Sequence, residues 1–162
     1  MNAQNKRLSF EKIKTYDAHD RTNLVTVGGM LTPGVSPVPA WDAAGFSRLT
    51  DAVARARKQA RPVILSFGAH VIKNHLSRYL IALVREGYVT HLAGNGACSI
   101  HDFELAYLGG TSEDVPTAIE DGSFGMWEQT GRWMNEALQD GAKNDWGYGE
   151  SLARYMEVLP LP

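Results

Sequence analysis

The chain of 162 residues has one cysteine, no excess of basic residues and no long apolar run. A single cysteine excludes an internal disulfide and is typical of a reducing compartment. The 16 basic and 18 acidic residues give a formal net charge of -2, which argues against a nucleic-acid surface. No stretch approaches the ~20 apolar residues of a membrane span, and no secretory signal is visible. We therefore expect a cytoplasmic protein without nucleic-acid or membrane partners.

What is present is the composition of an ordinary globular protein, with 44% hydrophobic residues and a length that suits one domain. Residues 1–41 are mostly polar and end in a proline-rich stretch, so we expect an N-terminal arm followed by an extended loop. Residues 42–162 carry the periodic apolar pattern of helices and strands. We expect this second part to form the folded α/β domain.

Residues 62–97 read as strand, helix, strand, with a turn of small residues after each strand. The strands are expected at 63–67 and 89–93, and the helix between them is expected to run from a cap at Asn74 to Gly87. Consecutive strands joined by a helix run parallel. The sequence therefore predicts an α/β fold with a partial, Rossmann-like parallel sheet and a helical C-terminal portion.

A further short strand is expected at 24–27, and the chain beyond Ala97 is expected to be wholly helical. One helix, with Asp42 as its N-cap, precedes the parallel unit. The expected helices lie at 43–60, 102–108, 111–119, 124–138 and 150–158. Two or three parallel strands make a poor core alone, because both faces need cover. Either more strands lie within residues 1–40 or the chain is half of a larger fold, and we favour the second.

Two turns are the candidate ligand-binding elements, because ligands of parallel sheets lie outside the carboxyl ends of the strands. The first turn contains Gly68, Ala69 and His70, and the second contains Gly94, Asn95, Gly96 and Ala97. Small residues permit a close approach of the backbone to a ligand, and the free N–H groups of a following helix favour anions. Neither turn matches the dinucleotide fingerprint or a P-loop. Plain connecting turns are the alternative interpretation.

His101, Asp102 and Glu104 follow the second turn and are the candidate catalytic residues. A histidine between carboxylates can act as a general acid or base, or orient an amine substrate. Helix capping by Asp102 is the competing interpretation. Cys98 is either a small buried residue or a nucleophile. The histidines do not have the spacing of metal ligands, so we expect no metal site.

The order of these motifs resembles the N-terminal half of deoxyhypusine synthase. The matching runs are residues 68–76, the helix to Gly87, the strand 89–93, and Asn95-Gly96-Ala97 through Ile100-His101-Asp102-Phe103-Glu104. These runs are more similar still to the bacterial deoxyhypusine synthase-like proteins, which have a motif similar to N-G-A-x-x-I-H-D-F-E. Thr111 to Val115 and Asp121 to Gly125 also read like this subgroup. The resemblance covers roughly residues 60–140.

The resemblance implies a Rossmann-like fold that binds NAD. In the synthase, NAD accepts a hydride from spermidine, and an aminobutyl group passes through a lysine imine to a protein lysine. By the same resemblance, residues 68–70 match a turn that contacts the cofactor, and residues 95–97 match a turn beneath the cofactor. His101 and Asp102 match an acidic pair beside the cofactor and the substrate. His101 stands in place of a glutamate, and the family's catalytic lysine lies in the other half of the fold.

Three functions are therefore kept open. The first is NAD-dependent transfer of an aminoalkyl group from a polyamine-type amine, with this chain as the cofactor-binding half of a homo-oligomeric protein. The second is a non-catalytic, oligomeric binding module. The third is a hydrolase or isomerase of a small amine or sugar phosphate, with His101 as its base.

Overall fold

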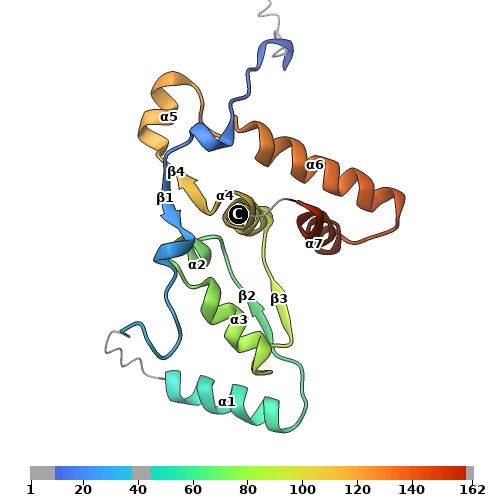
Figure 1. The fold of residues 1–162 in the computed structure, drawn as a ribbon. Helices are drawn as coiled ribbons and strands as arrows, with labels where there is room; N and C mark the ends of the chain where they lie inside the picture. Colours follow the sequence, from blue (N-terminus) through green and yellow to red (C-terminus); the bar gives the residue numbers. More distant parts are fainter. Residues whose placement is uncertain (1–9, 38–44, 160–162) are drawn as a thin grey trace, which may run out of the picture.

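The fold is a mixed α/β arrangement in which helices predominate and the strands form two small sheets (Figure 1). The computed structural model describes residues 10–37 and 45–159. Strands β2 and β3 form one sheet, and β1 and β4 form the other. The predicted mixed α/β class with a parallel pair is confirmed, but the strands of the described residues do not form one continuous Rossmann-like sheet.

The parallel unit consists of β2 (Ile64–Ser66) and β3 (His91–Ala93), which pair along their whole length. Helix α1 (Phe46–Lys58) precedes β2. Two helices, α2 (His70–Lys73) and α3 (Ser77–Arg85), connect the strands. The predicted order of strand, helix and strand is confirmed, and the carboxyl ends of both strands lie at the same edge of the pair.

The predicted start of the connecting helix at Asn74 is wrong, and Asn74 instead ends α2 by donating its N–H to the carbonyl of His70 at 2.9 Å. His75 follows with φ at +67°, in the left-handed region that interrupts a helix. Helix α3 then starts at Ser77 without a side-chain cap. The other predicted cap, Asp42, lies outside the described residues.

The expectation of only helices beyond Ala97 is also wrong, because β4 (Gly110–Glu113) is a strand. It pairs antiparallel with β1 (Asn23–Thr26), the strand that was expected at 24–27. Val25 of β1 lies opposite Thr111 of β4. The polar residues of this segment resemble a helix cap, but their pairing with a distant strand overrides that local preference.

Helix α4 starts at Gly96, six residues before the predicted start, because Asn95 caps it. Asp102 therefore lies inside the helix, and the interpretation of Asp102 as a cap is wrong. The helical C-terminal portion otherwise follows the prediction with shifted boundaries. Its elements are α4 (Gly96–Leu108), α5 (Val115–Asp121), α6 (Glu128–Lys143) and α7 (Tyr148–Val158).

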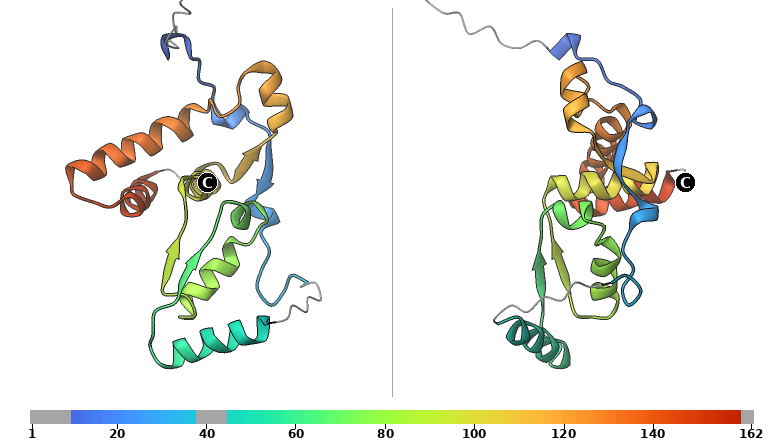
Figure 2. Two further views of the ribbon diagram at one scale, coloured as in Figure 1. Left: turned by 180° about the vertical axis from the view of Figure 1, so that it is seen from behind. Right: turned by 90° about the vertical axis from the view of Figure 1, so that its left-hand side faces the viewer.

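Helix α4 lies across the middle of the molecule and contributes to both hydrophobic clusters (Figure 2). On one side it packs with α6, α7 and the short 3-10 helix Ala18–Asp20. On the other side it packs with β1 and α2. The buried residues of the first cluster are Ala18, Phe103, Tyr107, Met134, Ala137 and Leu152, and those of the second are Val25, Met30, Ile72, Cys98 and Leu105.

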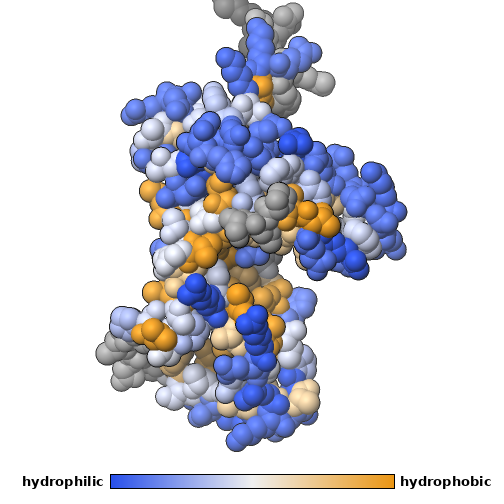
Figure 3. All heavy atoms as spheres, in the orientation of Figure 1, coloured by the Kyte–Doolittle hydropathy of each residue, from blue (hydrophilic) through white to orange (hydrophobic). Residues whose placement is uncertain are grey.

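The parallel pair is only partly covered. Ile64 is 67% exposed and Leu92 is 40% exposed, and hydrophobic surface gathers near the junction of this unit with α4 (Figure 3). Sheets of two strands need cover on both faces.

No helix within residues 10–37 and 45–159 has the length and apolar character of a membrane span.

We predict that Gly141→Ala destabilises the packing of α6 on α7 by about 1–3 kcal/mol, the usual range for overpacking. A Cβ at Gly141 would lie 1.8 Å from Ser151 Oγ and 2.6 Å from Ser151 Cβ. Gly131→Ala in the same helix is the control, since a Cβ there meets nothing within 4 Å. It should stabilise the protein by roughly 0.5–1 kcal/mol. Urea denaturation measures both, and equal effects would contradict this account of the interface.

Candidate functional site

The two predicted turns lie side by side, because they follow neighbouring parallel strands. The N–H of Phe67 donates to the carbonyl of Ala93 at 3.0 Å and continues the pairing up to the turns. Gly68 and His70 of the first turn are exposed, and so are all of residues 94–97 in the second. The structure therefore brings the predicted cofactor-binding residues together at one edge of the sheet.

Cys98 packs between the two turns. Its buried Sγ lies 3.6 Å from the carbonyl oxygen of Phe67 and 3.4 Å from Asn95 Oδ1. Asn95 Oδ1 also accepts the backbone N–H of Cys98 at 3.2 Å and so caps α4. A Cβ at Gly94 would lie only 3.2 Å from Cys98 Cβ, so glycine allows this close packing. The burial of Cys98 favours a packing role over nucleophilic chemistry.

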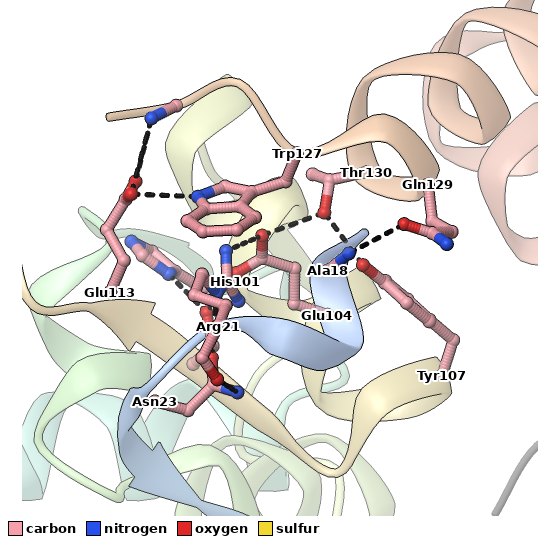
Figure 4. A network of polar contacts seen from close by, with 12 residues as sticks. Ala18, Arg21, Asn23, His101, Glu104, Tyr107, Glu113, Trp127, Gln129 and Thr130 are labelled. Atoms are coloured by element: carbon pink, nitrogen blue, oxygen red, sulfur yellow. Dashed lines mark hydrogen bonds and ion pairs between the residues drawn. The ribbon is translucent and has the colours of Figure 1, made fainter. Parts of the chain in front are cut away.

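Glu104 lies at the centre of a buried polar network (Figure 4), with 2% of the residue exposed. Its Oε1 accepts from Arg21 Nη1 at 2.6 Å and from Thr130 Oγ1 at 2.9 Å. Its Oε2 accepts from Thr111 Oγ1 at 2.5 Å. The Tyr107 hydroxyl lies 2.8 Å from Thr130 Oγ1, and burial raises the pKa of Tyr107. The network thus joins the N-terminal segment, α4, β4 and α6.

Arg21 is buried with its partner, and 3% of each side chain is exposed. Besides the ion pair, its Nε donates to Asn23 Oδ1 at 2.9 Å. Its Nη2 has no acceptor among the described residues. The Trp127 ring lies 5.4 Å from the guanidinium carbon, close enough for a cation–π interaction. Desolvation of two charges is expensive, so these partners are needed to hold the pair in place.

His101 lies on the same side of α4 as Glu104 and is half-buried. Its Nδ1 is 2.7 Å from Thr111 Oγ1. Burial is the main reason that the pKa of His101 is below its ordinary value of 6.5, and the charge of Lys73 adds to the lowering. The Glu104 carboxylate raises the pKa of His101 and only partly offsets burial. His101 is therefore a neutral imidazole near neutral pH.

Asp102 lies on a different side of α4. It lines an apolar cavity of about 470 Å³ between α3, β3 and α4. His101 and Glu104 line another cavity, of about 460 Å³, between α4, β4 and α6. Desolvation raises the pKa of Asp102, although part of its side chain reaches solvent. The structure therefore brings together two of the three predicted catalytic residues and separates the third from them.

Sequence reasoning missed most of the network around Glu104. The missed residues are Arg21, Thr111, Glu113, Trp127 and Thr130. Arg21 is 83 positions away from Glu104, and Thr130 is 26 positions away. Separations of this size in the sequence do not indicate that these side chains contact Glu104. Glu113 accepts from the Trp127 Nε1–H at 2.8 Å, and both residues line the cavity that His101 and Glu104 line.

Metal binding has no support in the described part of the chain. Residues 10–37 and 45–159 contain no group of three or more His, Cys, Asp or Glu side chains that could hold a metal ion. The site is instead made of turns with exposed backbone and of a histidine connected to a buried ion pair.

We predict that the free energy of unfolding falls as the pH is lowered from about 7.5 to about 5.5, in part because of His101. Its pKa is lower in the folded state than the ordinary value of 6.5, so the unfolded chain takes up the proton first and is favoured. His101→Gln should reduce this loss, whereas His91→Gln, at an exposed histidine, is the control. Urea denaturation at several pH values measures the effect. An unchanged pH dependence in His101→Gln would contradict it.

Comparisons of the chain with protein-family models, with curated proteins and with solved structures found no match. The site of this chain therefore carries the evidence on function. Its two distinctive parts are the adjacent turns at the end of the parallel strands and the cavity that His101 and Glu104 line, called the His101 cavity below. Both parts depend on α4, which begins at the second turn and carries His101 and Glu104.

Proposed function

We propose that the chain is the cofactor-binding half of an NAD-dependent, deoxyhypusine synthase-like enzyme that transfers an aminoalkyl group from a polyamine-type amine. One observation carries this proposal. Two glycine-containing turns end neighbouring parallel strands at the same edge, and the 13-residue helix α4 starts from the second turn. Parallel α/β folds bind nucleotides at this position. In this proposal, the β2–β3 unit is part of a Rossmann-like sheet.

The open backbone of the turns supports the proposed cofactor. A Cβ added at Gly68 or Gly96 would meet nothing within 4 Å, so the backbone is open there. The cap residue Asn95 accepts the N–H of Cys98, whereas the N–H groups of Gly96 and Ala97 have no acceptor among the described residues and favour anionic groups such as a pyrophosphate. The apolar cavity beside Gly94 is lined in part by Phe67 and Leu92 and suits a flat ring. The residues present therefore fit NAD.

NAD supplies a hydride acceptor when it is bound. Residues 68–70 and 94–97 are the groups of this chain that would hold it. His101 is neutral near pH 7 and can accept a proton from an amine. Asp102 lines the other cavity, so it would meet a cationic group of the ligand on the cofactor side of α4 and not beside His101. Exposed apolar residues such as Ile64 favour action as a homo-oligomer.

A second candidate function is acid–base chemistry without NAD, in a hydrolase or isomerase of a small amine or sugar phosphate. The observation that favours it is the hydrogen-bonded chain from His101 through Thr111 to Glu104. A carboxylate that orients a histidine is a recurring arrangement of general bases. This function needs the His101 cavity and not the turns.

We predict that the protein binds NAD and that Gly96→Asp raises the dissociation constant roughly tenfold or more, because a negative charge would face the pyrophosphate. Gly149→Asp is the matched control. Gly149 is also an exposed glycine in the first turn of a helix, and a Cβ there meets nothing within 4 Å. Both substitutions place an acid in the first turn of a helix, where the helix dipole favours a negative charge, so the two variants are matched in their effect on the helix. Isothermal titration calorimetry with NAD measures the affinities.

The outcomes separate the three functions. NAD binding that is weakened by Gly96→Asp and unaffected by Gly149→Asp supports the cofactor-binding half. Absence of NAD binding together with a stable oligomer supports the non-catalytic module. Turnover of a small amine or sugar phosphate without NAD, lost in His101→Ala, supports the hydrolase or isomerase.

A further inference from the structure

The hydrogen bonds around Thr111 determine which nitrogen of His101 carries a proton. A threonine hydroxyl has one proton to donate and two lone pairs that accept. Thr111 Oγ1 lies 2.5 Å from Glu104 Oε2 and 2.7 Å from His101 Nδ1. Glu104 is paired with Arg21 at 2.6 Å, so its carboxylate acts as an acceptor. The single proton of Thr111 is therefore directed to Glu104.

In the hydrogen bond between Thr111 and His101, the threonine oxygen must then be the acceptor. Because Thr111 has no second proton, its oxygen accepts the Nδ1–H of His101. The order of donation is His101 Nδ1–H to Thr111, and Thr111 O–H to Glu104. In a neutral imidazole only one nitrogen is protonated, so Nε2 keeps a lone pair.

The imidazole of His101 lies at the His101 cavity. His101 lines this cavity of about 460 Å³ together with Lys73, Glu113 and Trp127. Among residues 10–37 and 45–159, the ring has a hydrogen-bond partner only at Nδ1, and Nε2 is not one of the buried atoms without a partner, so Nε2 is open to solvent. The charged or titratable groups that act on the ring are Glu104 on α4, Arg21 on the N-terminal segment, and His70 and Lys73 on α2. Of these, only the Glu104 carboxylate favours protonation of His101.

We propose that Thr111 is a positioning residue that holds His101 as the Nδ1–H tautomer, so that Nε2 presents a proton acceptor to a ligand of the His101 cavity. A ligand of this cavity must then offer a hydroxyl or an amine N–H to Nε2. Glu104 and Arg21 act through Thr111, because the ion pair fixes the acceptor that orients its hydroxyl. The catalytic use of this acceptor rests on the proposed function, whereas the tautomer does not.

The test is 15N-edited NMR of the histidine rings at a pH about one unit above 6.5, on the full chain without ligand. The His101 signals are assigned by their loss in His101→Gln. We expect Nδ1 of His101 at the position of a protonated nitrogen and Nε2 at that of an unprotonated one. In Thr111→Val, the ratio of the two neutral tautomers should move toward Nε2–H by roughly twofold to tenfold, as expected for the loss of one hydrogen bond. Thr111→Ser should restore the wild-type ratio.

Thr130→Val is the matched control for a merely structural effect. Thr130 donates to the same carboxylate at 2.9 Å but does not contact His101. Its substitution should destabilise the network and leave the tautomer ratio unchanged. A proton on Nε2 in the unsubstituted protein would overturn the proposal even if no variant folds. Equal tautomer shifts in Thr111→Val and Thr130→Val would also overturn it. Both readouts are independent of NAD binding, so failure of the cofactor proposal is detected separately.

Discussion

The buried ion pair between Arg21 and Glu104 is the interaction on which the rest of the structure depends. The Glu104 side chain is only 3% exposed and needs a full set of donors, because desolvation of an unpaired charge is very costly. The donors come from the N-terminal segment, from Thr111 of β4 and from Thr130 of α6. The pairing of β1 with β4 and the position of α6 on α4 are thereby connected to one side chain.

Helix α4 connects the buried ion pair to the candidate site, because it carries Glu104 and begins at the second turn. Its N-terminus is held at the second turn by Asn95, and its buried residues belong to both hydrophobic clusters. His101 lies between these ends and is connected to the ion pair through Thr111. The turns and the His101 cavity are therefore connected through one helix, α4.

The sequence predicted the parts of this arrangement that depend on local pattern. The parallel unit follows from two short apolar runs that end in small residues, and the proximity of the turns follows from their strands. The site network could not be predicted, since Arg21 reaches Glu104 only through the β1–β4 pairing. That pairing was hidden because Thr111 to Asp114 look locally like a helix start. Asp102 was grouped with His101 because they are adjacent in sequence, yet adjacent residues of a helix point in different directions.

The central claim is that the buried pair holds these elements together, and the most direct test is the free energy of unfolding of Arg21→Met in urea. We predict a loss of about 3–5 kcal/mol, because Glu104 remains buried without its charged partner. Adding Glu104→Leu should recover part of this loss. The control is Arg132→Met, at an exposed pair with Glu128, which should cost less than about 1 kcal/mol. A similarly small loss in Arg21→Met would contradict the account.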